Sequence, residues 1–281
     1  MVKYDPDHIR EFYDHYGIQE WERLEKTAYE RLQFALQWHF VEKYLPRGAR
    51  VLDAGGGPGR FAVELARAEA EVVLLDISPV QLEIAERKLR EAGEEIKSRV
   101  MLIEGDICKL PFSEEGFDLT LAMGGPLSYV LERAEEALGE LKRVTKRGGY
   151  IILSVMSNFG GARFAVKHKM LQYFREPEAY DLWGLIERGI QGDHVPPERR
   201  TPHRCKFYTS GELRKLLEKV ELEVLEMAAI PSISAHLGEE LEAFAGEPLA
   251  WGNLLRVEIR LCREPGLLDT GGHILVVAQR L

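Results

Sequence analysis

Short apolar runs alternate along the chain with longer segments in which apolar residues recur at helical spacing. The short runs predict buried strands at about 50–54, 71–76, 99–104 and 117–122, and a fifth strand near 149–155. The longer segments predict helices at about 58–69, 78–92 and 132–146. Because strands alternate with helices, the pattern predicts an α/β fold with a doubly wound, mostly parallel sheet.

The segments on either side of this core have no such alternation. Residues 5–45 carry apolar positions at helical spacing, and we expect two helices broken near Gly17. The positions expected on one face are Trp21, Leu24, Ala28, Leu32, Ala35, Leu36 and Val41. After the core, the stretch 157–207 has no strand pattern but contains plausible helices around 160–174 and 178–190. It is too long for a simple connection, so we expect a helical lid over a ligand pocket.

The last third of the chain returns to the sheet. Thr209, Ser210, Gly211 and Glu212 have the sequence of a helix start, and a strand is expected near 222–229. An insertion at 230–270, with one helix around 249–262, precedes a final strand at 273–279. We therefore predict a single domain over residues 1–281. Its parts are a helical cap (1–46), a cofactor-binding core (47–156), the lid (157–207) and a C-terminal part of the sheet (208–281) that contains the insertion 230–270.

Composition narrows the class of protein. The 281 residues are 45% hydrophobic and 30% charged, and no apolar run of 18 residues is present, so we expect no membrane insertion. A net charge of −9 argues against a nucleic-acid-binding surface, although Arg199, Arg200, His203, Arg204 and Lys206 form a local basic stripe. Three scattered cysteines and no signal peptide suggest the cytoplasm. Scarce asparagine with abundant Glu, Arg and Lys suggests a thermophile.

The candidate ligand loop is the glycine-rich turn between the first strand and the next helix. Asp53 is followed by Gly55, Gly57 and Gly59, and the next strand ends in Asp76. Such a turn lets a ligand approach the backbone and points helix N–H groups at an anion. A nicotinamide fingerprint would have glycine at position 60, where this chain has Arg60, so a dinucleotide is disfavoured.

With these motifs the chain resembles the class I S-adenosylmethionine-dependent methyltransferases of the small-molecule type. Further motifs of that family resemble Glu104-Gly105-Asp106-Ile107, Leu110-Pro111-Phe112, Phe117-Asp118 and Lys146-Arg147-Gly148-Gly149. The resemblance covers about residues 48–156. It implies a seven-stranded sheet in which the last strand is antiparallel and inserted between the fifth and sixth. It also implies S-adenosyl-L-methionine as cofactor and S-adenosyl-L-homocysteine as product.

The resemblance assigns expected roles to individual residues. Asp76 is expected to accept the ribose hydroxyls, Asp106 the adenine amino group, and Ile77 and Ile107 to cover the adenine faces. Arg23 is expected to bind the methionine carboxylate, and Met123 to lie where the acceptor meets the methyl group. Structural alternatives stay open: Asp76 can cap a helix, Asp106 can close an Asx turn, and Arg23 can be a solvated charge.

Two residues are candidates for direct contact with the methyl acceptor. His203 is the candidate general base, because an imidazole titrates near neutrality, and Tyr129 can position an acceptor through its phenol. Either can instead be structural. The sequence has no CxxC or HExxH motif, so no metal is expected.

Three functions remain open. The first is methylation of an N, O or C atom of a small molecule. The second is methylation of RNA or protein through the basic stripe, and the third is a cofactor-binding regulator without catalysis. The oligomeric state is open, with a dimer possible.

Overall fold

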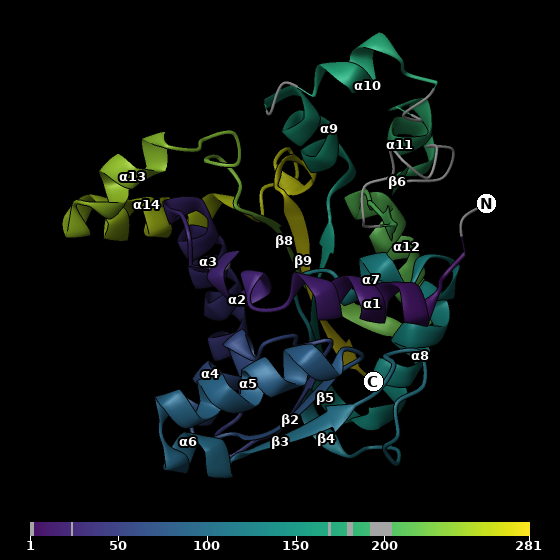
Figure 1. Ribbon diagram of the computed structural model, residues 1–281, viewed down its shortest axis with the longest axis vertical. Helices are drawn as coiled ribbons and strands as arrows, with labels where there is room; N and C mark the ends of the chain where they lie inside the picture. The colour runs from purple at the N-terminus through teal and green to yellow at the C-terminus, as the bar shows by residue number, and fades with distance from the viewer. Residues whose placement is uncertain (1–2, 24, 168–169, 179–181, 192–203) are drawn as a thin grey trace.

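The computed structural model describes residues 3–23, 25–167, 170–178, 182–191 and 204–281. Its centre is a seven-stranded sheet of order β3-β2-β1-β4-β5-β9-β8, flanked by helices (Figure 1). The strands are β1 (Arg50–Ala54), β2 (Glu71–Asp76), β3 (Val100–Glu104), β4 (Phe117–Ala122), β5 (Thr145–Met156), β8 (Leu222–Ile230) and β9 (His273–Arg280). The pairings of β1 to β5 are parallel, and β9 runs antiparallel between β5 and β8. The predicted doubly wound sheet with an inserted last strand is confirmed.

The connections within the core are helical. They are α4 (Arg60–Arg67), α5 (Pro79–Ala92), α6 (Glu94–Ser98), α7 (Pro126–Tyr129), the 3₁₀ turn η1 (Leu131–Arg133), α8 (Ala134–Val144) and α12 (Ser210–Lys219). Ser78 caps α5 by accepting from the Gln81 amide, and Thr209 caps α12 together with Glu212. These caps explain why both helices begin where the sequence predicts.

The N-terminal segment differs from the prediction of two helices. It forms α1 (Pro6–Tyr16), α2 (Gln19–Arg23) and α3 (Ala28–Tyr44). Gly17 ends α1 with a φ of +53°, as expected, but a second break follows because Thr27 and Glu30 form a capping box that starts α3. Trp21 therefore belongs to a separate short helix. Its ring packs under the guanidinium of Arg60 instead of continuing the buried face of α3.

The two long insertions also contain more elements than the sequence indicates. Between β5 and α12, the described residues form α9 (Asn158–Lys167), α10 (Leu171–Arg175), α11 (Leu182–Arg188) and the two-residue strands β6 (Ile190–Gln191) and β7 (Cys205–Lys206). Between β8 and β9, they form α13 (Glu240–Ala245), α14 (Pro248–Leu261) and the 3₁₀ turn η3 (Leu268–Thr270). The single helix predicted for the second insertion is thus two, because Pro248 starts a new helix after Gly246.

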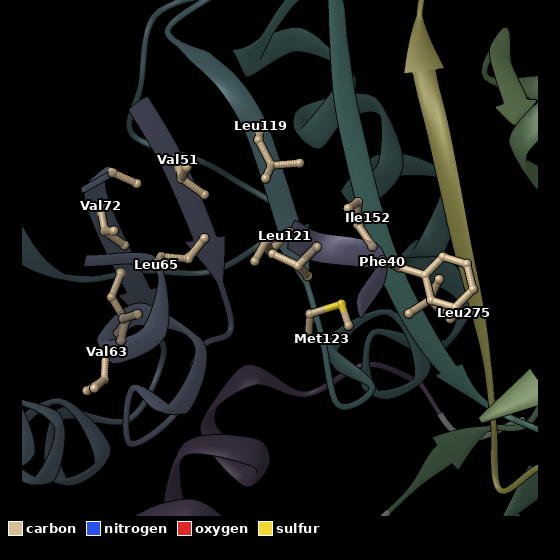
Figure 2. Close-up of a cluster of buried hydrophobic side chains, with 14 of the residues drawn as sticks. Phe40, Val51, Val63, Leu65, Val72, Leu119, Leu121, Met123, Ile152 and Leu275 are labelled. Atoms are coloured by element: carbon tan, nitrogen blue, oxygen red, sulfur yellow. The ribbon is translucent and has the colours of Figure 1, made fainter. Parts of the chain in front are cut away.

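Each face of the sheet packs on its own hydrophobic core. Helices α3, α4 and α5 cover one face, where Phe40 lies against Ile152 and Leu275 near Met123 (Figure 2). Helices α7, α8 and α12 cover the other face, with Leu127, Leu138 and Leu213 buried. The carboxyl ends of the parallel strands meet at one edge, and α9 continues from β5 beyond that edge (Figure 1). In open α/β sheets, ligands bind at this edge.

Candidate functional site

The glycine-rich turn between β1 and α4 needs glycine for two reasons. Gly55 has a φ of +73°, and a Cβ there would lie 2.6 Å from Cγ of Pro126, so a side chain at this position would collide with the start of α7. Gly57 has a φ of +53°, and a Cβ there would meet nothing within 4 Å. Gly57 therefore faces open space, as a backbone that cradles a ligand does.

Asp76, at the carboxyl end of β2, is held against this turn. Its Oδ2 accepts from the Gly57 amide at 2.8 Å, and its Oδ1 accepts from the Ser78 amide at 2.9 Å. Burial raises the pKa of Asp76 to about 6, against the lowering effect of these amides. Each carboxylate oxygen can accept a further hydrogen bond, so the side chain is able to bind a diol.

Asp53 is buried behind the turn. Neither oxygen of its carboxylate has a hydrogen-bond partner of normal geometry in the described part of the chain, although the Ala62 amide is near enough to act on its pKa. Burial first and the nearby Asp76 second raise the pKa of Asp53 to about 7, and the Ala62 amide acts weakly in the opposite direction. Buried carboxylates normally have hydrogen-bond partners, so these oxygens mark a place where a donor is missing. A cofactor that brings an amino group to this turn fits that need.

Asp106 lies just beyond the carboxyl end of β3. Its Oδ1 accepts from the Cys108 amide at 2.8 Å, which is the Asx turn left open above. Its side chain also bonds the Tyr4 hydroxyl, and Oδ2 lies 3.9 Å from Nη1 of Arg133. Asp106 and Ile107 both line the same cavity as Asp76 and Ile77.

That cavity has a volume of about 1430 Å³. It runs from the glycine-rich turn past Met123, Gly124 and Tyr129 to the helices of the predicted lid, where Arg163, Phe164 and Tyr173 contribute to its wall. Pockets for single small ligands usually measure about 300–1,000 Å³. The cavity therefore has room for a nucleotide-sized cofactor and a second molecule beside it.

Arg23 lies in the cavity wall next to Glu20. Its Nε donates to Oε2 of Glu20 at 2.9 Å, and one Nη also donates to that carboxylate. Burial opposes the charge of Arg23, but the bond to Glu20 more than offsets this and holds its pKa above the usual range. The second Nη of Arg23 is not used in the pair with Glu20, so the guanidinium can bind another acceptor only through that edge.

Tyr129 and Tyr13 meet in the wall of the same cavity. Their rings are 6.0 Å apart between centroids in an edge-to-face arrangement, and their hydroxyls are hydrogen-bonded to each other. Burial raises the pKa of both phenols above the usual value. Tyr129 is thus a neutral hydrogen-bonding group at neutral pH and cannot act as a phenolate base. The other candidate, His203, lies outside the described residues.

Sequence reasoning missed three polar residues of the cavity wall. Gln33 and Gln37 come from α3, and His273 is the first residue of β9. Nε2 of Gln33 lies 2.7 Å from Nδ1 of His273, and Nε2 of Gln37 donates to the Ser154 hydroxyl at 3.3 Å. One signal in the sequence could have indicated Gln33 and Gln37: they are polar residues four positions apart on a helical face that is otherwise buried.

The described ranges contain neither a candidate metal cluster nor a membrane-spanning helix. Nowhere in them do three or more His, Cys, Asp or Glu side chains gather as a metal would require. Within the same ranges, every helix is too short or too polar to cross a membrane.

Comparison with known proteins gives the class. A family model described as "Methyltransferase domain" matches residues 51–149. The ubiquinone/menaquinone biosynthesis C-methyltransferase of Idiomarina loihiensis is 38% identical over 111 residues, which are 38% of this chain and 42% of that protein. The enzyme of the same name from Blochmanniella pennsylvanica is 36% identical over 179 residues, 62% of this chain and 59% of that protein.

Solved structures agree on the fold. A structure from Thermotoga maritima, described as a possible histamine N-methyltransferase that depends on S-adenosylmethionine, aligns with a TM-score of 0.58 at 19% identity. The alignment covers 98% of this chain and 100% of that one. With the glycine-rich turn, the acid at the end of β2 and the strand order, these matches show that the chain has the fold of the class I S-adenosylmethionine-dependent methyltransferases and that its residues 51–149 match a methyltransferase domain. The matched regions span 42% and 59% of the lengths of the two curated relatives.

We expect the substitution Asp76→Ala to weaken binding of S-adenosylhomocysteine by about 1.5–3 kcal/mol, the usual value of hydrogen bonds to a charged group. Isothermal titration calorimetry measures the change. Asp118→Ala is the matched control, because Asp118 lies near the start of β4, at the opposite edge of the sheet, and should leave affinity unchanged. A folded Asp76→Ala protein with the affinity of the parent would contradict the assignment.

A second prediction concerns stability and pH. Because the pKa of Asp53 is raised to about 7, the folded protein binds this proton more tightly than the unfolded chain does. The contribution of Asp53 to the free energy of unfolding is therefore fully present below about pH 4 and is lost as pH rises to 7. We expect Asp53→Asn to gain stability relative to the parent over that range, measured by urea unfolding without ligand. A pH-independent difference would contradict the raised pKa.

Proposed function

We propose that this protein transfers the methyl group of S-adenosylmethionine to a small-molecule acceptor by direct displacement. The observation that carries the proposal is the cavity of about 1430 Å³, which continues from the glycine-rich turn past Met123 into the space under α9 to α11. A binding protein for the cofactor alone needs no such extension. The extension of the cavity therefore supports an enzyme more than a cofactor-binding regulator without catalysis.

The residues of the turn are proposed to hold the cofactor. Asp76 binds the ribose hydroxyls, Asp106 takes the adenine amino group, and Ile77 and Ile107 enclose the ring. The turn itself, with Asp53, Gly55 and Gly57, lies against the methionine end, where the free edge of Arg23 reaches the carboxylate. The fit is supported by the two oxygens of Asp53, for which the described residues supply no hydrogen-bond donor of normal geometry, and by the open side of Gly57.

When bound, S-adenosylmethionine supplies a methyl group attached to a positively charged sulfur. As the acceptor atom forms its bond to the methyl carbon, the carbon–sulfur bond breaks and the sulfur leaves as a neutral thioether. The protein's part is mainly to align the acceptor and to exclude water. Well-oriented intramolecular reactions gain about 7–11 kcal/mol of barrier, whereas a general base adds about 10²- to 10⁴-fold in rate. Tyr129 serves as a neutral positioning group, and His203 stays a candidate base.

The acceptor is proposed to have an apolar or aromatic body. Beside the lid helices, the cavity is lined by aromatic side chains: Tyr29, Phe164, Tyr173 and Phe207. The curated relatives are named C-methyltransferases of ubiquinone/menaquinone biosynthesis, which supports carbon as the methylated atom. RNA or protein methylation has less support, since the chain carries a net charge of −9, which disfavours a surface for nucleic acid. We further propose a cytoplasmic enzyme. A dimer and a thermophilic source are still predictions.

Transfer of labelled methyl groups tests the function. We expect label from [methyl-³H]S-adenosylmethionine, incubated with the protein and a cell extract, to appear in the small-molecule fraction. Asp76→Ala should reduce the incorporation, and Asp118→Ala should not. Label in the RNA or protein fraction would favour the macromolecular alternative, and cofactor binding without any transfer would favour the regulator.

The lid is tested separately by hydrogen exchange. We expect S-adenosylhomocysteine together with the acceptor found by labelling to slow amide exchange in residues 157–207 more than either ligand alone. The physical reason is that α9 to α11 contribute Phe164, Tyr173 and Leu185 to the cavity wall, so a filled cavity gives them contacts. Protection that followed protein concentration and ignored ligands would indicate an interface between copies and would contradict a lid.

A further inference from the structure

His273 is a histidine of the cavity wall with a defined hydrogen-bonding state. Its Nδ1 lies 2.7 Å from Nε2 of Gln33. An amide NH₂ only donates, so in this orientation Nδ1 accepts and the proton of the neutral ring is on Nε2. Burial first and the charge of Arg23 second lower the pKa of His273 to about 4, which keeps the ring neutral at physiological pH.

The antiparallel insertion of β9 is what brings this residue to the ligand-binding edge. His273 begins β9 opposite Met156, the last residue of β5, so the two lie at the edge where the parallel strands end. Leu275, two residues further on, packs with Phe40 and Ile152 on the face covered by α3 (Figure 2). Because strand side chains alternate, His273 lies on that same face, beyond the apolar core.

His273 continues a row of polar groups that starts at the carboxyl end of β4. The Gly124 amide donates to the Ser154 hydroxyl at 2.8 Å, and Gln37 donates to the same hydroxyl. Gln33 lies one helical turn before Gln37 and holds His273. Polar side chains at the border of a hydrophobic core are costly unless they are hydrogen-bonded. Each glutamine here has a partner, so the row is a built feature of the wall.

The chain is closely packed where β9 begins. His273 and Arg23 line the same cavity, and the charge of Arg23 contributes to the lowered pKa of the ring. Gly272, the preceding residue, has no room for a Cβ, which would lie 2.8 Å from the Tyr29 hydroxyl. On the side of the lid, Gly160 of α9 packs more closely still, because a Cβ there would lie 2.1 Å from the carbonyl oxygen of Gly271. The ring still lines the cavity between these elements.

We propose that His273, oriented by Gln33, is a specificity-determining residue that donates its Nε2–H to an oxygen of the methyl acceptor. It selects acceptors that carry a hydroxyl or carbonyl on an apolar body over acceptors of the same outline without that oxygen. This inference rests on the proposed function and adds the chemical class of the acceptor.

A matched pair of probes tests the inference. With the protein saturated with S-adenosylhomocysteine, calorimetry gives dissociation constants for 1-naphthol and for 1-methylnaphthalene, which differ in the oxygen. A neutral hydrogen bond contributes about 0.5–1.5 kcal/mol, so in His273→Phe we expect the dissociation constant for 1-naphthol to rise about two- to twelvefold relative to that for 1-methylnaphthalene. His39→Phe is the control, because His39 is also partly buried but comes from α3 outside the cavity lining, and its ratio should stay within about twofold of the parent.

A second measurement does not depend on any acceptor. In ¹⁵N spectra of the histidine-labelled protein at pH 7, the signals of His273 are those that disappear in His273→Phe. In the parent protein these signals should show a protonated Nε2 and an unprotonated Nδ1. Gln33→Leu should remove this preference. The opposite tautomer in the parent protein would overturn the inference.

The outcomes separate the inference from the function it rests on. An unchanged ratio in a folded His273→Phe protein that binds S-adenosylhomocysteine overturns the role of His273, as does a parent protein that binds neither probe. Both results leave methyl transfer intact. Failure of the parent protein to bind S-adenosylhomocysteine or to transfer label refutes the proposed function itself.

Discussion

The bond from the Gly57 amide to the Asp76 carboxylate is the contact on which the rest of the site depends. It joins the turn after β1 to the end of β2, and it forms only because Gly57 adopts a positive φ. Gly55 in the same turn leaves space for Pro126 at the start of α7, so the end of β4 can approach as well. Three strand ends are thereby brought together before any ligand binds, which lowers the conformational entropy that binding would otherwise cost.

The N-terminal helices are attached to this turn through one side chain. Arg60, the first residue of α4, pairs with Glu25 and lies over the rings of Phe34 and Trp21. Arg60 stands where a dinucleotide fingerprint would have glycine, and its side chain instead holds α2 and α3 over the site. A second contact joins α1 to α5. The side-chain amide of Gln81 in α5 donates to the carbonyls of Tyr13, in α1, and Gly17, which ends α1. The cap and the cofactor turn are thus parts of one packed unit.

The sequence predicted what depends on local patterns and failed where distant segments meet. Strand and helix positions followed from apolar spacing, and the starts of α5 and α12 followed from Ser78 and Thr209. The second break before α3 was missed because a capping box at Thr27 and Glu30 is easily read as part of a continuous helix. The pairing of Gln33 with His273, separated by 240 positions, has no local signature and appears only once β9 is inserted beside β5.

The insertion of β9 beside β5 also means that distant parts of the chain line different parts of the cavity. The residues proposed to hold the cofactor lie between Arg23 and Met123, whereas His273 enters the cavity from the last strand. The two groups are proposed to contact different ligands and are separated in the sequence by α7 to α14. Mutation can therefore alter the acceptor wall through β9 while the cofactor turn is conserved, so related chains can diverge in substrate without first losing their methyl donor.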